Sequence, residues 1–496
     1  MNPRLRFAPS PTGYVHIGGL RTALYNYLYA KQNEGTYLIR VEDTDQTRFV
    51  EGAIEGMINS MQWAGVVHDE GPFIDEGTHH VVEKGDFGPY IQSHRLELYK
   101  KHSDKLIESG HAYYCFCTKE RLEQVREKQK SEGLTPKYDG HCRELSKAEV
   151  DEKLAAGLPH VVRLKLPAGR VIEFNDAIKG HIAVNTDDMD DQVLMKTDGF
   201  PTYHMAVVVD DHFMGITHVV RGDEWLISTP KHIYTYEAFG WEAPQFVHLP
   251  VILGQSKKKL SKREGDVSVE DFKRKGYLPE ALINYIALVG WSPDDGEEIM
   301  DMQTLINKFS FDRVSKSSGV FDVEKLNWMN NQYIRNYDLD QLTVLSKSYF
   351  VESGFASDTE FDEEFVKYKN IVDILRERLN KLNEISDYYN LFNVNTIVLE
   401  DDEAKEMIEM PHVPSMLRCF SAKVAEIDAI TADDVKRLLK EVQKETGHKR
   451  KDLFMPVRVA LTGQVHGPDI AKVMEIIGTA NTIERIEYSI QNLCAE

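Results

Sequence analysis

The first 45 residues carry a strand–loop–helix–strand pattern, which constrains the fold more than any other feature of the sequence. Residues 5–8 form a short extended run, and residues 9–19 contain two prolines and three glycines, as loops do. Apolar residues then recur at helical spacing from Leu20 until Gly35, and residues 37–41 are predicted to form a second strand. A unit of this length favours a doubly wound parallel sheet, whose ligands lie beyond the carboxyl ends of the strands.

The rest of the chain predicts an interrupted sheet and then a helical half. A segment from about residue 112 to 190 mixes helical and strand patterns, and the apolar run 203–209 is predicted to be a buried strand of the main sheet. From about residue 321 the pattern is mostly that of amphipathic helices. We therefore predict an α/β N-terminal half with an α+β insertion, followed by an all-α C-terminal half.

Composition excludes several classes of protein. No stretch approaches the ~20 apolar residues that a membrane span needs, and the N-terminus lacks the apolar core of a signal peptide. Without such a span we expect no membrane partner. Five cysteines in 496 residues form no disulfide framework, so we expect a reducing cytoplasm. The net charge of −21, taken alone, argues against a nucleic-acid partner, since basic surfaces usually meet polyanions.

The first candidate phosphate site is the HIGG run at residues 16–19, where the loop meets the helix. Glycines let the backbone approach phosphates, and helix N-termini attract anions. The imidazole of His16 can donate a hydrogen bond to a phosphoryl oxygen as charge builds there. The alternative is that His16 is only a turn residue.

The second candidate is the KKKLSKR run at residues 257–263, which follows the strand-like segment 251–253. Five of its seven residues are cationic, and lysine ammonium groups act as point charges on phosphate oxygens. The run is therefore either a loop that clamps a triphosphate, braced by Ser261, or a solvated basic surface.

Together the two runs, about 240 residues apart, resemble the paired signatures of class I aminoacyl-tRNA synthetases. Further runs are similar to those of the bacterial glutamyl-tRNA synthetase family: RFAPSPTG at 6–13, RVEDTD at 40–45, GFPTYH at 199–204, VVDDH at 208–212, RGDEW at 221–225 and LFMPVRVALTG at 453–463. The resemblance covers essentially the whole chain. It implies a Rossmann-like catalytic domain at 1–111 and 191–255, an acceptor-end-binding insertion at 112–190, a stem-contact region at 256–320 and a helical anticodon-binding domain of two subdomains at 321–496.

The resemblance also implies a two-step reaction. ATP with Mg²⁺ activates L-glutamate to glutamyl-adenylate, and the glutamyl group then passes to the 3′ end of the tRNA for glutamate. Such a reaction needs positioning and stabilisation of phosphoryl charge rather than a nucleophilic side chain. The alternatives are an enzyme that also charges the tRNA for glutamine, and a non-catalytic tRNA-binding protein.

By resemblance, two sets of residues make up the active site. The ATP-binding set is His16, Gly18, Gly19, Glu224, Trp225, Lys259, Ser261 and Lys262, of which His16, Lys259 and Lys262 are also the catalytic residues. The glutamate-binding set is Arg6, Ala8, Ser10, Glu42, Tyr203 and Arg221.

The chemistry of the glutamate-binding set fits a dicarboxylic amino acid. Guanidinium groups bind carboxylates bidentately, so Arg6 and Arg221 suit the two carboxylates, and Glu42 suits the ammonium group. An arginine aimed at the side-chain carboxylate would leave its charge unpaired with glutamine. The alternatives are a solvated Glu42 and structural bridges from the arginines to Asp43 or Asp223.

Cys115, Cys117 and Cys142 are a candidate structural zinc site. Residues two apart on a strand face the same side, so the first two thiols can converge. Some family members bind zinc with a C-x-C, 24-residue, C-x-H pattern, but Glu144 stands at the fourth position here. Other candidates for the fourth ligand are Tyr138 and His141. Cysteines without a metal are the alternative.

Local charge favours tRNA although the whole chain is acidic. Basic residues outnumber acidic ones by eight to four in 257–275, five to two in 365–382 and eight to three in 436–458, so these segments could contact phosphates. Arg378 lies where the resemblance puts an arginine that reads the last anticodon base. We expect a monomer that binds tRNA and not DNA.

Overall fold

The computed structural model describes residues 2–261, 267–449 and 451–494. It divides into two compact units, one of Met1–Lys273 with Pro279–Val323, and one of Arg274–Leu278 with Glu324–Glu496. In the described part of the chain, no helix has the length and apolar character to cross a membrane.

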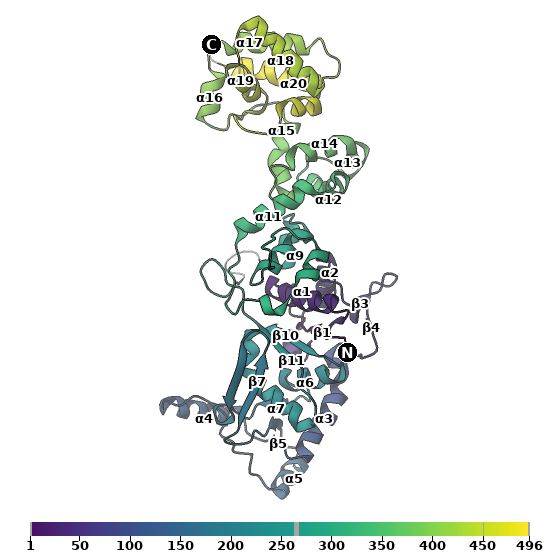
Figure 1. Ribbon diagram of the computed structural model, residues 1–496, viewed down its shortest axis with the longest axis vertical. Coiled ribbons are helices and arrows are strands. Elements are labelled where there is room, and N and C mark those ends of the chain that lie inside the picture. Colours follow the sequence, from purple (N-terminus) through teal and green to yellow (C-terminus); the bar gives the residue numbers. More distant parts are fainter. Residues whose placement is uncertain (1, 262–266, 450, 495–496) are drawn as a thin grey trace. The chain divides into compact units, whose positions relative to one another are not determined.

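The first unit is built on a six-stranded sheet (Figure 1). Its strands lie in the order β2 (Thr36–Ile39), β1 (Arg4–Phe7), β10 (His218–Gly222), β11 (Gln245–Leu249), β7 (Val171–Asp176) and β8 (Gly180–Asn185). All neighbouring pairs are parallel except β7–β8, which is antiparallel. Helix α1 (Ile17–Gln32) connects β1 to β2, so the predicted doubly wound unit is confirmed.

Two smaller sheets accompany the main one. A hairpin pairs β3 (Gly71–Ile74) with β4 (Val81–Lys84), and an antiparallel sheet contains β5 (Ala112–Cys115), β6 (Val161–Leu164) and β9 (Val193–Met195). The segment 112–190 therefore supplies strands to two sheets, because β5 and β6 form the small sheet while β7 and β8 extend the main one.

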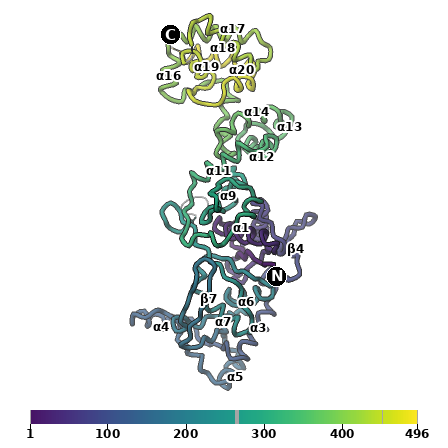
Figure 2. Tube along the Cα trace, viewed as in Figure 1, coloured from purple at the N-terminus to yellow at the C-terminus, as the bar shows by residue number. Residues whose placement is uncertain are grey.

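Nine further helices lie between residues 53 and 308: α2 (Ala53–Trp63), α3 (Leu96–Glu108), α4 (Lys119–Ser131), α5 (Lys147–Ala155), α6 (Tyr203–Phe213), α7 (Thr229–Phe239), α8 (Val269–Arg274), α9 (Pro279–Leu288) and α10 (Met302–Lys308) in the described residues. Helix α4 buries none of its residues and projects from the rest of its unit (Figure 2).

The predicted strand at 203–209 is wrong, because this run forms the first part of α6. Its valines are buried in the core of the first unit, and Asp210 and Asp211 at its end are buried too. The sequence of a helix that is enclosed on most sides is a continuous apolar run. Periodicity cannot distinguish such a run from a buried strand. The strand-like segment 251–253 also forms no strand; Leu253 makes only isolated bridges.

The second unit is all helical, as predicted. Its helices are α11 (Val323–Asn336), α12 (Leu339–Glu352), α13 (Asp358–Glu363), α14 (Phe365–Leu375), α15 (Tyr389–Asn393), α16 (Asp402–Ile408), α17 (Val413–Val424), α18 (Ala432–Thr446), α19 (Lys451–Thr462) and α20 (Ile470–Asn492). Helices α16 to α20 share one core, and α20 is interrupted at Gly478, whose φ is 81°.

Candidate active site

The loop after β1 ends at His16, which caps the N-terminus of α1. Its Nδ1 accepts a hydrogen bond from the backbone N–H of Gly18 at 2.9 Å, so the proton of a neutral ring lies on Nε2. A Cβ at Gly18 would lie 3.2 Å from that same Nδ1 and would push the ring aside. Glycine therefore preserves both the imidazole orientation and an open helix N-terminus, the arrangement that favours phosphate binding.

A cavity of about 610 Å³, here called the nucleotide cavity, opens at this helix N-terminus. Six predicted ATP-binding residues line it: His16, Gly18, Gly19, Glu224, Lys259 and Ser261. The two candidate phosphate sites, far apart in sequence, thus meet at one cavity. Lys262 lies outside the described residues, and Trp225 lines the neighbouring cavity instead.

Lys259 reaches the nucleotide cavity from a tight hairpin. Leu253 and Lys259 form a β-bridge, and the backbone N–H of Gly254 donates to the carbonyl of Lys258 at 2.8 Å. The Lys259 side chain is 67% exposed, and its ammonium lies 3.7 Å from a carboxylate oxygen of Glu224. Such an exposed pair contributes little, so a phosphate can replace the carboxylate as the partner of the lysine.

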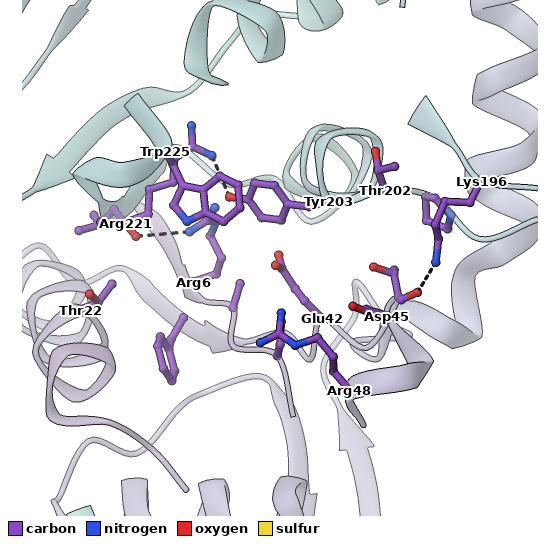
Figure 3. A pocket seen from close by; sticks show the side chains of 17 residues that line it. Arg6, Thr22, Glu42, Asp45, Arg48, Lys196, Thr202, Tyr203, Arg221 and Trp225 are labelled. Carbon is purple, nitrogen blue, oxygen red and sulfur yellow. Dashed lines mark hydrogen bonds between the residues drawn. The ribbon is translucent and has the colours of Figure 1, made fainter. Parts of the chain in front are cut away.

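A second cavity of about 590 Å³, here called the amino-acid cavity, adjoins the first, since Thr22 and Gly222 line both. All six residues predicted to bind glutamate line it, namely Arg6, Ala8, Ser10, Glu42, Tyr203 and Arg221 (Figure 3). They come from β1 and its loop, the segment after β2, the start of α6 and the end of β10. The cavity thus lies at the carboxyl ends of adjacent parallel strands.

Sequence reasoning missed six polar residues of the amino-acid cavity, namely Thr22, Thr44, Asp45, Arg48, Lys196 and Thr202. The Lys196 ammonium donates to the Thr44 carbonyl at 2.9 Å, which joins segments 152 residues apart (Figure 3). Thr44 and Asp45 belong to the RVEDTD run and could have been included on that ground. Arg48 and Lys196 lie outside the recognised runs, so only the folded chain reveals them.

Buried ion pairs hold the charged groups of the amino-acid cavity. Arg6 Nε donates to Asp211 Oδ1 at 3.0 Å, and Arg40 Nη1 donates to the same oxygen at 2.7 Å. Arg40 Nη2 also donates to Glu42 Oε1 at 3.1 Å, and all four side chains are buried. Arg6 is therefore bridged to Asp211 rather than to Asp43, and Glu42 is not a solvated strand end.

Burial also shifts the pKa of Glu42. Removal from water raises the pKa of this carboxyl above its ordinary value, although Arg40 and Arg6 oppose the rise. Asp211 behaves in the opposite way, because burial would raise its pKa but Arg6 and Arg40 outweigh burial and hold that pKa low. Glu42 is thus the carboxylate of the cavity that protonates first as the pH falls.

We expect the KM for glutamate to rise as the pH falls through the pKa of Glu42, because protonation removes the charge that suits the substrate ammonium. Since this pKa is raised, the rise should begin above the ordinary glutamate pKa of about 4.3. Steady-state charging assays between about pH 8 and about pH 5, with the KM for ATP as control, measure it. A KM for glutamate that is constant over this range contradicts the expectation.

Arg221 differs from Arg6 in its partners. Its Nη1 donates to the Tyr203 hydroxyl at 2.9 Å, and the Tyr203 ring packs on Trp225 with centroids 4.0 Å apart. In the described chain, none of its hydrogen-bond partners is a carboxylate; Asp223 pairs with Lys179 at 2.9 Å instead. A buried guanidinium without a carboxylate partner favours an anionic ligand.

The three predicted zinc-binding cysteines converge in the first unit. The sulfur atoms of Cys115, Cys117 and Cys142 all lie within 4.8 Å of one another. The Tyr138 hydroxyl lies 3.4 Å from the Cys115 sulfur and 3.6 Å from the Cys117 sulfur. Glu144 lies outside this cluster with its side chain 85% exposed, so Tyr138 is the better fourth ligand. Three thiols and an oxygen form a donor set suited to Zn²⁺.

The second unit has a polar cavity of about 670 Å³, here called the C-terminal cavity. Arg378, Tyr388 and His466 are among its lining residues. Arg378 Nη2 donates to the carbonyl of Gly467 at 2.6 Å, which anchors the guanidinium at the cavity. An arginine beside aromatic rings can stack on and hydrogen-bond to an unpaired nucleobase.

Comparison with known proteins identifies the family. The family model "tRNA synthetases class I (E and Q), catalytic domain" matches residues 3–328, and an anticodon binding domain model matches residues 341–490. The chain is 56% identical over 490 residues to a glutamate–tRNA ligase of Alkaliphilus metalliredigens, covering 99% of each chain. It is 55% identical over 493 residues to that of Clostridioides difficile, covering 99% of this chain and 100% of the relative.

A solved structure agrees with these relatives. The crystal structure of a glutamate tRNA ligase from Elizabethkingia meningosepticum, in complex with its amino acid, matches with a TM-score of 0.88 at 35% identity. The match covers 99% of this chain and 100% of that one. With sequence and structure in agreement over nearly the full length, the chain belongs to the glutamate–tRNA ligase family of class I tRNA synthetases.

Proposed function

We propose that this chain activates L-glutamate with ATP and transfers the glutamyl group to the 3′ end of the tRNA for glutamate. The observation that carries the proposal is the pair of adjoining cavities that share Thr22 and Gly222. One gathers two guanidinium groups and a buried carboxylate, which suit a dicarboxylic amino acid. The other gathers His16 and Lys259 at a helix N-terminus, which suit a triphosphate.

In the first step, the α-carboxylate oxygen of glutamate bonds to the α-phosphorus of ATP, and the bond to pyrophosphate breaks. Arg6, Arg221 and Glu42 hold the three charges of the amino acid, which orients the α-carboxylate toward the nucleotide cavity. His16 and Lys259 stabilise the charge that builds on the phosphoryl oxygens and on pyrophosphate. Mg²⁺, when bound with ATP, would neutralise further phosphate charge without a dedicated protein cage.

In the second step, the 2′-hydroxyl of the terminal tRNA adenosine attacks the carbonyl carbon of the adenylate, and AMP leaves. The deciding measurement is glutamate-dependent ATP–pyrophosphate exchange with and without tRNA, followed by charging of the purified tRNAs for glutamate and glutamine. We expect exchange and charging of the tRNA for glutamate. Failure of exchange in the presence of that tRNA would overturn the proposal, and equal charging of both tRNAs would broaden its substrate range.

We further propose that Arg378 reads an anticodon base in the C-terminal cavity. Arg378→Gln should raise the KM for tRNA by about 5-fold to 150-fold, the loss typical of one base contact. The KM for glutamate should not change. Arg376→Gln is the matched control, because Arg376 pairs with Asp373 and does not line the cavity. Similar KM values for both variants would argue against a reading role.

We also propose that Cys115, Cys117 and Cys142 hold a structural Zn²⁺ with Tyr138. Protein purified without chelator should contain about one zinc per chain, and Cys142→Ser should lower both the zinc content and the melting temperature. Cys419→Ser, in the second unit, is the control and should retain the metal. If the wild-type protein purified without chelator contains no zinc and melts at the same temperature as Cys142→Ser, the proposal is contradicted.

The remaining expectations concern the state of the protein. We propose that it works as a monomer in a reducing cytoplasm. All five cysteines are unpaired, which fits such a compartment. Light scattering of the purified chain with and without tRNA measures the oligomeric state.

A further inference from the structure

The hydrogen-bond acceptors around Arg221 are imidazole and hydroxyl groups, none of which carries a negative charge. They come from β11, α6 and α7. Arg221 Nε donates to His248 Nε2 at 3.1 Å, and its Nη1 donates to Tyr203 at 2.9 Å. Its Nη2 donates to Thr229 Oγ1 at 2.9 Å and lies 3.2 Å from His232 Nδ1. Four of the five N–H bonds of the guanidinium are thereby directed, so its plane is fixed in the cavity.

These contacts determine where the histidine protons lie. Arginine has no acceptor, so each ring nitrogen that faces it must accept. His248 therefore carries its proton on Nδ1, which donates to Asp176 Oδ2 at 2.6 Å. His232 carries its proton on Nε2, which donates to His204 Nδ1 at 3.0 Å. The set is satisfied only when all three imidazoles are neutral.

The surroundings keep the rings neutral. Burial, followed by Lys231 and Arg221, lowers the pKa of His204 to about 4. Burial and the charge of Arg221 hold the pKa of His232 well below its ordinary value. Burial also lowers the pKa of His248, although its hydrogen bond to Asp176 opposes the shift.

We propose that the Asp176–His248 and His204–His232 pairs are positioning residues that orient Arg221 and leave its charge for the side-chain carboxylate of the substrate. This inference rests on the proposed role of Arg221 in glutamate binding. Arg6 shows the contrast, because it pairs directly with the carboxylate of Asp211, which it shares with Arg40. A carboxylate in place of His248 would cancel the charge of Arg221 and remove the preference for glutamate over neutral glutamine.

The first test compares two replacements of His248. His248→Leu removes the acceptor of Arg221 Nε, whereas the amide oxygen of His248→Gln can reach the place of Nε2. We expect the leucine variant to raise the KM for glutamate by about 10-fold to 100-fold and to lower the glutamate-to-glutamine ratio. The KM for ATP and kcat should change little, and the glutamine variant should regain most of the affinity.

The second test changes the tautomer. Asp176→Asn offers an N–H to His248 Nδ1, which moves the ring proton to Nε2 and against Arg221. It should raise the KM for glutamate as His248→Leu does. In the His248→Gln background the same change should add little, because an amide has no ring tautomer to switch. His218→Leu is the control, because His218 lies on β10 with Arg221 but lines neither cavity.

Two outcomes would overturn the inference: equal KM values for glutamate in the leucine and glutamine variants of His248, or the full loss from Asp176→Asn persisting in the His248→Gln background. Arg221→Ala separates this failure from that of the proposed function. If Arg221→Ala leaves the KM for glutamate unchanged, the proposed role of Arg221 fails. If it raises that KM while the His248 variants do not, only the positioning role fails.

Discussion

Arg221→Ala should remove most of the ability to use glutamate. The guanidinium is buried and has no carboxylate among its partners in the described chain, so the substrate side chain would lose the group that offsets its desolvation. Truncating one member of a buried charge pair costs about 2–5 kcal/mol, which lowers kcat/KM roughly 30-fold to 5,000-fold. Charging assays over a range of glutamate concentrations measure the loss.

The same variant should erode selection against glutamine, because the loss falls on the charged substrate. Arg221→Lys should be intermediate, since an ammonium keeps the charge but not the two-pronged geometry. Arg170→Ala, which removes an exposed pair with Glu237, is the control. An unchanged ratio of glutamate to glutamine use in Arg221→Ala would locate the discriminating group elsewhere.

Lys259→Ala should lower kcat for ATP–pyrophosphate exchange by about 10²–10³, as the loss of a transition-state charge contact typically does. The KM for glutamate should change little, because Lys259 lines the nucleotide cavity and not the amino-acid cavity. Lys262→Ala is expected to have the same effect from its place in the KLSKR run. Rates of ATP–pyrophosphate exchange at saturating ATP measure the loss in both variants.

Lys258→Ala is the matched control for the loop. It removes a charge from the same hairpin, but Lys258 does not line the nucleotide cavity. Equal losses in Lys258→Ala and Lys259→Ala would indicate a general electrostatic attraction of ATP, which added salt would screen, rather than a specific phosphate contact.

Much of the fold could be predicted from local patterns. The strand–loop–helix–strand unit and the helical second half follow periodicities that a few neighbouring residues determine. The prediction failed at Tyr203–Phe213, where an enclosed helix has no polar face to reveal its period. The same segment carries Asp211, whose position opposite Arg6 no local pattern could reveal.

The residues of the two cavities were predicted by recognising ordered runs, and their roles stay predictions. Recognition was effective for Arg6, Glu42 and Arg221 because each lies in an ordered run of proline, glycine or acidic residues. It could not identify Lys196 or the histidines that contact Arg221. Those residues act through contacts with partners distant in sequence, as in the 72-residue separation of Asp176 and His248.

The doubly wound N-terminal unit, the helical C-terminal half and the family could all be predicted without coordinates, because they depend on local periodicity and on ordered runs of residues. Folding, in contrast, is needed to show that Arg6 pairs with Asp211 while Arg221 is held by histidines. It also shows that β7, inside the predicted insertion, delivers Asp176 to the main sheet. The physical reason is that charge compensation and proton positions depend on which groups fold within hydrogen-bonding distance, and packing rather than sequence proximity sets that distance.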